Sequence, residues 1–318
     1  MKIIKHSEIR SLGLSPLQYM KWVEEALLNQ QRSTLPPKTS IALPNDGFFN
    51  IMPCYIPESN VMGVKVVNRF LCNNPALDAS LLLYNATTGE QKALMDATLI
   101  TTMRTGAVAA TSILKLMKKK SETNILSIMG LGATARATLL CLLDATPEKT
   151  FIIRLMKYKD QAEKFVERFK AYENISFQIV DEYEKFFVGA DIIVSCITSA
   201  TQTYGKDDWF KKGVLVVPVH TRGFQNCDLF FDKVYGDLKD QISHFKFFNE
   251  FKYFNEFTKV VQGEDKGREN DSERILVYNI GIALHDIYIA EKIFTLIMEK
   301  AEIVADFDFK EDVDKFYL

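Results

Sequence analysis

The sequence of 318 residues has no long uninterrupted apolar run and no excess of charge of one sign. No stretch approaches the roughly 18 apolar residues that a membrane span requires, and the first residues contain no apolar core of signal-peptide length. The formal net charge is −2, with basic and acidic residues mixed along the chain, so no basic surface for nucleic acid or an anionic membrane is indicated. We therefore expect a cytoplasmic protein with neither nucleic acid nor a membrane as a partner.

Cysteine and histidine are also scarce. The five cysteines are scattered, odd in number and never at the spacing of metal ligands, which is typical of reduced thiols in a reducing compartment. The four histidines lie equally far apart, at His6, His220, His244 and His285. The sequence therefore predicts no disulfide and no metal site.

What the sequence does have is a hydrophobic content of 47%, enough for about two domains in a chain of this length. Residues 15–30 predict an amphipathic helix, because Ser15 suits the N-cap and Pro16 the first helical position. Residues 39–95 carry short β-rich runs separated by turn residues, which indicates a mixed or antiparallel sheet. Asp96 then begins a long apolar helix with a basic end.

After residue 121, apolar strands alternate with helical segments. The strands read NILSIMG, TFIIRL, ISFQIV, DIIVSCI and VLVVPV, a pattern typical of a parallel sheet covered on both faces. Residues 245–257 match neither the strand nor the helix period and are interpreted as a surface helix or loop. The charged residues 264–273 predict a solvated loop, and residues 282–300 an amphipathic helix.

The first of these strands leads directly into a glycine-rich turn and then a helix, in the pattern Gly-x-Gly-x-x-Ala. Gly130 permits a tight turn, Gly132 lets the backbone approach a pyrophosphate, and the small Ala135 lets helix and strand pack closely. The N-terminus of the helix then faces the phosphates. This context predicts a dinucleotide site, and the alternative is a glycine-rich turn that binds nothing.

The loop after the second strand of this domain bears on the choice between NAD and NADP. A fold that selects NAD places an acidic residue there, on the ribose 2′-hydroxyl. This sequence has Lys157 and Lys159 beside Tyr158, which suit a 2′-phosphate and an adenine face. NADP(H) is therefore favoured over NAD(H), unless the loop is merely solvated or a shift of about two residues brings Asp160 into place.

Four segments together resemble the ornithine cyclodeaminase and mu-crystallin family, in order and spacing, over most of the chain: MPCYIPESNVMGVKVVN, TTGEQKALMDATLITTMRTGAVAA, IMGLGATARA and VYNIGIALHDIYIA. The resemblance implies an α/β fold with a central Rossmann domain, a doubly wound parallel sheet, at residues 121–281. It also implies a split α+β substrate-binding and dimerisation domain at 1–120 and 282–318. A homodimer is expected, because the apolar N-terminal strands would otherwise be exposed.

Two cations are the main candidates for the substrate site. Lys65 is a lone cation in an apolar strand, and Arg104 lies in a helix among small residues, so each needs a partner. A lysine and a bidentate arginine form a fitting receptor for a carboxylate, and the resemblance places the substrate-binding lysine and arginine of the family at these positions. It makes Lys38 a third candidate. The alternatives are an internal salt bridge for Lys65 and Arg104 and a surface position for Lys38.

Two departures from the family bear on the reaction. Members that cyclise ornithine have an aspartate in the loop after the fifth Rossmann strand, where this chain has Arg222. They also have a glutamate two residues before a Met-Pro pair, where this chain has Asn50. Because ornithine cyclisation needs a group that accepts a proton from an ammonium, the loss of both carboxylates argues against the lyase reaction.

His220 and Arg222 lie together after that strand. His220 is a candidate catalytic acid or base, since a reference pKa of about 6.5 allows proton transfer near neutrality; a hydrogen-bonded turn residue is the alternative. Arg222 is a candidate for binding a second carboxylate, as in a dicarboxylic or opine-like substrate, and a salt bridge to Asp228 or Asp232 is the alternative. Asp286 matches a family helix near the nicotinamide, and a helix-start cap is equally consistent.

The sequence thus predicts an NAD(P)-dependent oxidoreductase that acts on an amino or imino acid, with Lys65 and His220 as catalytic residues. An ornithine cyclodeaminase that recycles NAD internally and a non-catalytic NADP(H)-binding accessory protein are the alternatives. The expected substrate-binding residues are Lys38, Lys65, Arg104 and Arg222. The expected cofactor-binding residues are Thr105, Gly130, Gly132, Ala133, Thr134, Lys157, Lys159 and Thr198.

Overall fold

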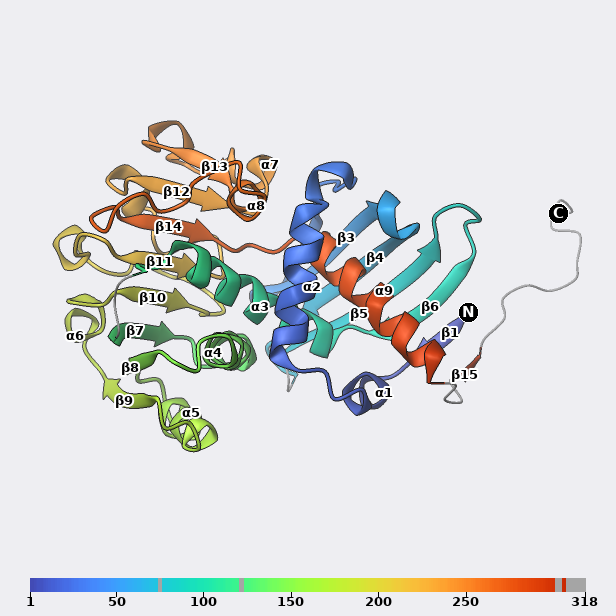
Figure 1. The fold of residues 1–318 in the computed structure, drawn as a ribbon, viewed down its shortest axis with the longest axis horizontal. Helices are drawn as coiled ribbons and strands as arrows, with labels where there is room; N and C mark the ends of the chain where they lie inside the picture. The colour runs from blue at the N-terminus through green and yellow to red at the C-terminus, as the bar shows by residue number, and fades with distance from the viewer. Residues whose placement is uncertain (74–75, 120–122, 301–304, 307–318) are drawn as a thin grey trace, which may run out of the picture. The chain divides into compact units, whose positions relative to one another are not determined.

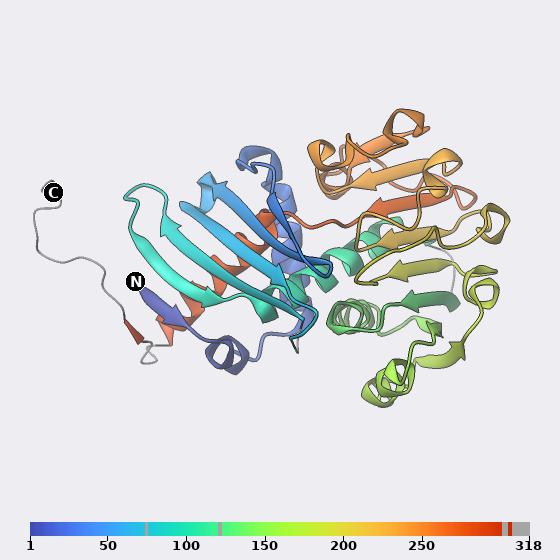
Figure 2. The same cartoon turned by 180° about the vertical axis from the view of Figure 1, so that it is seen from behind.

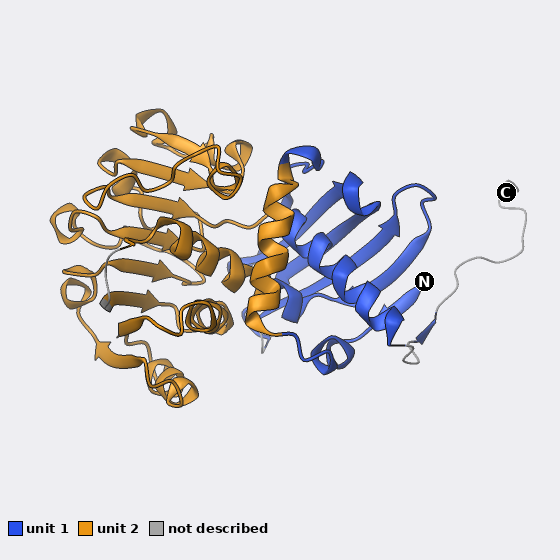
Figure 3. Cartoon of the chain, viewed as in Figure 1, with its two compact units in different colours: residues 1–14, 31–101, 283–318 blue, residues 15–30, 102–282 orange. Residues whose placement is uncertain are grey.

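A computed structural model describes residues 1–73, 76–119, 123–300 and 305–306 of the chain (Figure 1). The chain forms two compact units, which Figure 3 shows in different colours. Unit 1 consists of Met1–Leu14, Gln31–Thr101 and Ala283–Leu318, and unit 2 of Ser15–Gln30 and Thr102–Ile282. Each unit has its own sheet.

Two segments that the sequence assigns to the first domain, residues 15–30 and 102–119, pack in unit 2. Helix α2 (Pro16–Leu28) packs against α4 (Ala133–Ala145) and α8 (Phe257–Val261). Its predicted start is confirmed, because the Ser15 side chain accepts a hydrogen bond from the Gln18 backbone. The apolar stripe of α2 identifies the helix, but it does not identify the unit against which that stripe packs.

The sheet of unit 1 has seven strands in the order β15-β1-β6-β5-β4-β3-β2. β1 and β6 are parallel and the other neighbours are antiparallel, so the predicted mixed sheet is confirmed. The strands are β1 (Lys2–Ile4), β2 (Thr39–Leu43), β3 (Gly47–Ile56), β4 (Val61–Arg69), β5 (Leu77–Asn85), β6 (Gln91–Asp96) and β15 (Ala305–Asp306). Unit 1 also contains α1 (His6–Ser11) and α9 (Ala283–Glu299).

The two faces of this sheet differ in their cover. Helix α9 packs against β3, β4 and β5 on one face, and Figure 2 shows the sheet from its other side, with α9 behind it. Met52, Lys65 and Leu81 lie opposite one another in register and are buried on the α9 face. By strand alternation, the opposite face carries mostly apolar side chains. They are Ile41, Ile51, Pro53, Tyr55, Met62, Val64, Val66, Leu82, Tyr84 and Leu94.

The sheet of unit 2 has eight strands in the order β13-β12-β14-β11-β10-β7-β8-β9, and every neighbouring pair is parallel. Four of its strands, β10, β11, β12 and β14, are buried at every residue. The strands are β7 (Thr123–Met129), β8 (Thr150–Met156), β9 (Ile175–Val180), β10 (Ile192–Ser195), β11 (Leu215–Pro218), β12 (Lys233–Gly236), β13 (Phe254–Glu256) and β14 (Ile275–Tyr278).

The order of these strands reverses next to β7. β8 and β9 follow on one side of β7, and β10 and β11 lie on its other side. In open parallel sheets, ligands bind at such a switch point, beyond the carboxyl ends of the strands. The remaining helices of unit 2 are α3 (Thr98–Leu116, whose first turn is counted in unit 1), α5 (Gln161–Phe169), α6 (Tyr183–Phe187) and α7 (Lys239–Ile242).

The interpretation of residues 245–257 as a surface helix or loop is wrong in part. The segment contains a 3₁₀ turn, Phe248–Glu250, and then β13, which pairs with β12 at the edge of the sheet. Phe248, Phe251 and Phe254 contact one another and pack against the core of unit 2. Each aromatic ring packs at a different place in this core. The spacing of the rings in the sequence therefore follows tertiary packing and not the period of a helix or a strand.

In the described part of the chain, no helix is both long and apolar enough to cross a membrane. All five cysteines are free. No group of three or more His, Cys, Asp or Glu side chains among the described residues could hold a metal ion.

Candidate active site

The glycine-rich turn lies between β7 and α4, at the switch point. Gly130 has a φ of +76°, and a Cβ there would lie 2.4 Å from the Cys196 carbonyl carbon, so only glycine fits. Gly132 precedes the helix as its N-cap, and a Cβ at this position would meet open space. Exposed backbone at the N-terminus of a helix of 13 residues is suited to a pyrophosphate, so the turn fits the dinucleotide that its sequence predicts. Ala133 and Thr134 form the first turn of this helix.

Gly106 explains how α3 is held beside the same helix. A Cβ on Gly106 would lie 2.5 Å from the Cβ of Ala137 in α4, so the two helix backbones approach more closely than larger residues would allow. Arg104 and Thr105 precede Gly106 on α3, and their helix is thereby fixed against the helix of the glycine-rich turn. The Arg-Thr-Gly motif therefore combines a cation with a packing requirement.

Arg104 is buried beside a carboxylate that the sequence did not single out. Asp237 follows β12 and accepts a hydrogen bond of 2.6 Å from the Gly281 backbone. Burial raises the pKa of Asp237, while the Gly281 N–H and the charge of Arg104 act in the opposite direction. Gly281 has a φ of +91°, and a Cβ on it would lie 2.8 Å from a guanidinium nitrogen of Arg104. Asn279 also bonds Asp237, so the arginine is set in a polar cluster.

Lys65 has the internal salt bridge that was the alternative to ligand binding. Its ammonium donates to the Asp286 carboxylate over 2.7 Å, and both residues are fully buried. Gly63 allows this contact, because a Cβ there would lie 2.6 Å from the side chain of Ile287 on α9. Asp286 is therefore more than a helix cap: it is the counter-ion of Lys65 and, with burial, raises the pKa of Cys54 to about 12.

Ser195 and His220 form a second polar pair at the carboxyl edge of the unit 2 sheet. Ser195 ends β10, His220 lies two residues beyond β11, and 2.6 Å separates the Ser195 Oγ from the His220 Nε2. Ser195 lies opposite Met129 in register, one residue before the glycine-rich turn. Burial lowers the pKa of His220 to about 4, below the usual value of histidine, so the ring is neutral at physiological pH.

Arg222 is exposed on the loop that follows His220. The salt bridges to Asp228 or Asp232 considered from the sequence are not formed. Asp228 instead accepts from the Tyr278 hydroxyl over 2.8 Å, and Asp232 accepts from the Arg274 backbone over 2.8 Å. The other departure from the cyclising enzymes, Asn50, accepts a hydrogen bond of 2.6 Å from Ser40.

The remaining predicted residues lie apart from these clusters. Lys157 and Lys159 are exposed on the loop after β8, where the backbone of Lys159 has a φ of +51°. Asp160 forms a surface ion pair of 2.6 Å with Lys164, so its charge is already directed toward α5. Thr198 is exposed beyond β10, in unit 2. Lys38 is half-buried directly before β2, in unit 1.

Sequence reasoning missed Ser195, Asp237 and Asn279. Each stands at or just after the carboxyl end of an apolar parallel strand. That position is itself a signal, because ligands of open α/β sheets bind at this edge. What the sequence could not show is that Asp237 lies beside Arg104, since the two are far apart in the chain and meet only through packing.

The chain belongs to the ornithine cyclodeaminase/mu-crystallin family, whose model matches residues 2–301. The resemblance inferred from the sequence is thereby confirmed. Among curated proteins it is 26% identical to the nodulation efficiency protein NfeD of Rhizobium meliloti over 274 residues, 82% of this chain and 83% of the relative. It is 25% identical to the alanine dehydrogenase of Archaeoglobus fulgidus over 323 residues, 94% of this chain and 95% of that one.

Solved structures agree with the fold. The Δ¹-pyrroline-2-carboxylate reductase of Thermococcus litoralis, in complex with NADH and L-proline, superposes with a TM-score of 0.82 at 24% identity, covering 96% of this chain and 100% of that chain. An archaeal alanine dehydrogenase dimer with bound NAD gives a TM-score of 0.83 at 22% identity, covering 98% and 99%. The predicted fold class, a Rossmann-type parallel sheet with a second, mixed-sheet domain, is therefore confirmed.

Proposed function

We propose that the protein is an NAD(P)-dependent oxidoreductase that acts on the CH–NH or C=N group of an amino or imino acid. The observation that carries the proposal is the shared edge of the unit 2 sheet. The Gly130–Gly132 turn, the Ser195–His220 pair and Asp237 beside Arg104 all lie at the carboxyl ends of its strands. Relatives named alanine dehydrogenase, ketimine reductase and Δ¹-pyrroline-2-carboxylate reductase support the substrate class.

In this proposal the nicotinamide of the bound dinucleotide exchanges hydride with the substrate Cα. Arg104 is a proposed carboxylate-binding residue. Lys65 and, more weakly, Lys38 stay candidates for the same role on the grounds of the sequence alone. Asp237 lies beside the Arg104 guanidinium, and Asp286 is the buried ion-pair partner of Lys65. Lys65 is also the proposed catalytic group for proton exchange, with Asp286 as its hydrogen-bond partner.

His220 stays a proposed catalytic residue, with a changed chemical role. A neutral imidazole is not a proton donor at pH 7, but it accepts a proton or holds a hydrogen bond to substrate. Ser195 fixes the ring by its contact with Nε2. We expect the pH dependence of kcat above pH 5.5 to contain no ionisation of His220, because its pKa of about 4 lies below that range.

NADP(H) is the proposed cofactor, because Lys157 and Lys159 follow the second strand and Asp160 is paired with Lys164. The named structures with NADH or NAD support a nicotinamide dinucleotide in general. Thr105, Ala133, Thr134 and Thr198 complete the proposed cofactor-binding set with the two glycines of the turn. A small-molecule substrate and a cytoplasmic location stay predictions.

The lyase alternative is tested directly. Purified protein given L-ornithine and NAD is expected to release neither proline nor ammonia, because Arg222 and Asn50 replace carboxylates and one acid or base contributes roughly 10²–10⁴-fold in rate. Proline is measured by mass spectrometry with and without protein. Robust proline formation would establish the cyclodeaminase reaction in place of the oxidoreductase.

The proposed reaction is tested by following NADPH and NADH oxidation with cyclic imines and with 2-oxo acids plus ammonia or amines. Net, stoichiometric oxidation of the dinucleotide with one of these substrates supports the proposal. Tight binding of NADPH without turnover of any of them would instead support the third possibility, an accessory protein that holds NADP(H).

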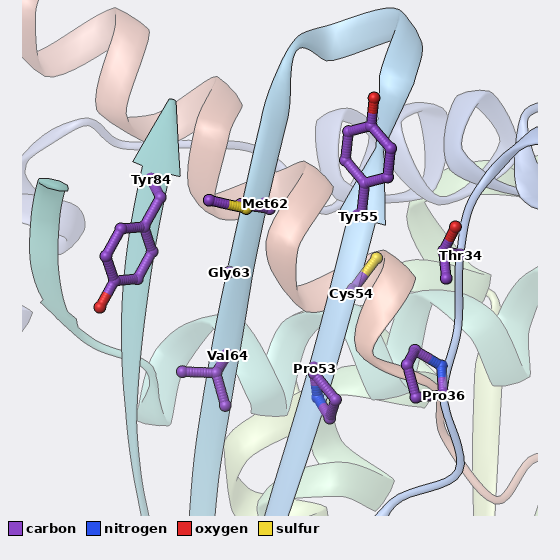
Figure 4. Close-up of a pocket in the computed structure, with 9 residues that line it drawn as sticks. All are labelled: Thr34, Pro36, Pro53, Cys54, Tyr55, Met62, Gly63, Val64 and Tyr84. Carbon is purple, nitrogen blue, oxygen red and sulfur yellow. The ribbon is translucent and has the colours of Figure 1, made fainter. Parts of the chain in front are cut away.

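A homodimer is also proposed, through the face of the unit 1 sheet that faces away from α9. That face is apolar, with Ile41 49% and Tyr55 41% exposed. Pro53, Tyr55, Met62, Val64 and Tyr84 are among the residues that line a pocket of about 330 Å³. Figure 4 shows these side chains on β3, β4 and β5. Exposed apolar faces of this kind are characteristic of contacts between subunits, and one solved structure with this fold is named as a dimer.

A further inference from the structure

We infer that the substrate carries a second anionic group, a side-chain carboxylate, and that Arg222 binds it. The inference rests on the proposed oxidoreductase function and narrows its substrate class from amino and imino acids in general to dicarboxylic ones. Three observations carry it: the charge balance of the candidate cations, the rigid loop that presents Arg222, and the position of that loop on the sheet.

Lys65, Arg104 and Arg222 differ in whether a carboxylate of the protein lies beside the cation. Lys65 has the Asp286 carboxylate at 2.7 Å, and Arg104 lies beside Asp237. Within the described residues, no hydrogen bond or ion pair holds the Arg222 side chain, although it lies in a part of the chain with three aspartates. Lys65 and Arg104 thus each lie beside a carboxylate of the protein, whereas no described carboxylate pairs with Arg222, so its charge is available for a second anionic group of the ligand.

The three aspartates of this part of the chain each have a contact with a group other than Arg222. Asp207 accepts from the Asn226 side chain over 2.8 Å, Asp228 from the Tyr278 hydroxyl, and Asp232 from the Arg274 backbone. Asp232 also lies 3.5 Å from the Lys252 ammonium. None of them neutralises Arg222.

The loop holds Arg222 in a fixed place. The Gln225 side chain accepts a hydrogen bond from the Gly223 backbone over 2.8 Å and donates one to the Thr221 carbonyl over 3.2 Å, so it closes the loop around Arg222. Gly223 has a φ of +105° and its carbonyl accepts from the Tyr204 backbone. Phe224 is fully buried in the core of unit 2. An arginine on so constrained a loop loses little backbone entropy when it binds an anion.

The loop lies at the carboxyl edge of the unit 2 sheet, where the substrate is proposed to bind. Arg222 lies four residues after the end of β11, and His220 lies two residues after it. Both are at the carboxyl edge of the sheet, with the dinucleotide turn and Ser195. A substrate whose Cα lies near the nicotinamide would direct its side chain away from its α-carboxylate. A guanidinium at this edge is then suited to a terminal carboxylate by a bidentate contact.

The experiment compares matched pairs of 2-oxo acids that differ in the terminal group. They are oxaloacetate with 2-oxobutanoate, 2-oxoglutarate with 2-oxopentanoate, and 2-oxoadipate with 2-oxohexanoate. Dissociation constants are measured by calorimetry on full-length protein loaded with NADPH, and kcat/KM is measured with ammonia present. The variants are Arg222→Ala, Arg222→Lys and, as the matched control, Lys212→Ala, which removes an exposed cation before the opposite end of β11.

In at least one pair, we expect the wild-type protein to bind the dicarboxylate at least tenfold more tightly than the monocarboxylate. Arg222→Ala should reduce that preference by roughly tenfold to a hundredfold, the usual range for a lost charge-assisted hydrogen bond, and leave monocarboxylate affinity unchanged. Arg222→Lys should keep part of the preference, because it keeps the charge but not the bidentate geometry. Lys212→Ala should keep all of it.

Several outcomes overturn the inference. The wild type could prefer the monocarboxylate in every pair, or Arg222→Ala could weaken both members equally. A loss of NADPH affinity in Arg222→Ala would assign the arginine to the cofactor, and an equal loss in Lys212→Ala would reduce the effect to general surface charge. Turnover without the preference would reject this inference alone, whereas the preference in binding without turnover of any substrate would reject the proposed function and retain the anion site.

Discussion

The two units bury carboxyl groups in different ways. In unit 1, Asp286 is fully buried and has the Lys65 ammonium at 2.7 Å. In unit 2, Asp228 is equally buried, but its Oδ1 accepts a hydrogen bond from the neutral Tyr278 hydroxyl, and its Oδ2 has no hydrogen-bond partner among the described residues. Burial raises the pKa of Asp228 to about 7. The same residue type therefore forms an ion pair in one unit, whereas in the other it is an acid that is about half protonated at neutral pH.

The two sheets also differ in how completely their strands are buried. In unit 2, β10, β11, β12 and β14 are buried at every residue, as expected for a sheet covered on both faces. In unit 1, the strands alternate between buried and partly exposed residues, and the partly exposed face is apolar. Unit 1 thus pairs its buried charge and has one sheet face that is apolar and partly exposed, whereas the four strands of unit 2 named above are covered.

The largest effect is expected at the ion pair of unit 1. Asp286→Leu should lower the free energy of unfolding by about 3–5 kcal/mol, because it leaves the Lys65 charge buried without a partner. The double variant Lys65→Met with Asp286→Leu should recover most of that loss, since no charge then remains buried. Urea denaturation measures both. A double variant as unstable as the single one would show that packing, and not charge, sets the stability here.

The next effect tests the apolar face of unit 1. Val64→Asp should convert the proposed homodimer into a monomer at micromolar concentration, with a dissociation constant raised by about a hundredfold or more, because the charge would be buried at the interface. Light scattering measures the mass. Ser176→Asp, at an exposed position of β9 in unit 2, is the control, and a wild-type monomer would contradict the proposal outright.

Asp228 should make the stability of unit 2 depend on pH, because its carboxyl group is buried without a charged partner in the described part of the chain. Its pKa is about 7 when folded and about 3.9 when unfolded, so the folded state binds more protons between these values. Stability from this group is therefore present below pH 4 and is lost as pH rises through 7. Asp228→Asn should flatten this dependence and be relatively more stable at pH 8, measured by thermal unfolding from pH 5 to 8. An unchanged pH profile would show that Asp228 is ionised in the fold.

How much of the fold and the candidate site can be predicted from the sequence depends on how far apart in the chain the interacting residues lie. The Gly130–Gly132 turn and the Ser15 cap follow from residues a few positions apart, and both were predicted. Lys65 was identified as a cation in need of a partner, but Asp286 lies 221 residues away, so the sequence left ligand and salt bridge open. The Phe245–Phe257 segment was misread because its rings are buried by a core that forms only in the folded unit.

The smallest effect concerns the cofactor loop of unit 2. Lys157 is exposed, and exposed ion pairs contribute little, so Lys157→Ala should weaken NADPH binding by only about twofold to fivefold and leave NADH binding unchanged. Fluorescence titration measures both affinities. Lys170→Ala is the matched control, because Lys170 is also exposed, at the far end of α5, and is paired with Glu167. If the protein binds NADH as tightly as NADPH, and Asp160→Ala weakens NADH alone, then Asp160 holds the ribose and the preference for NADP(H) is wrong.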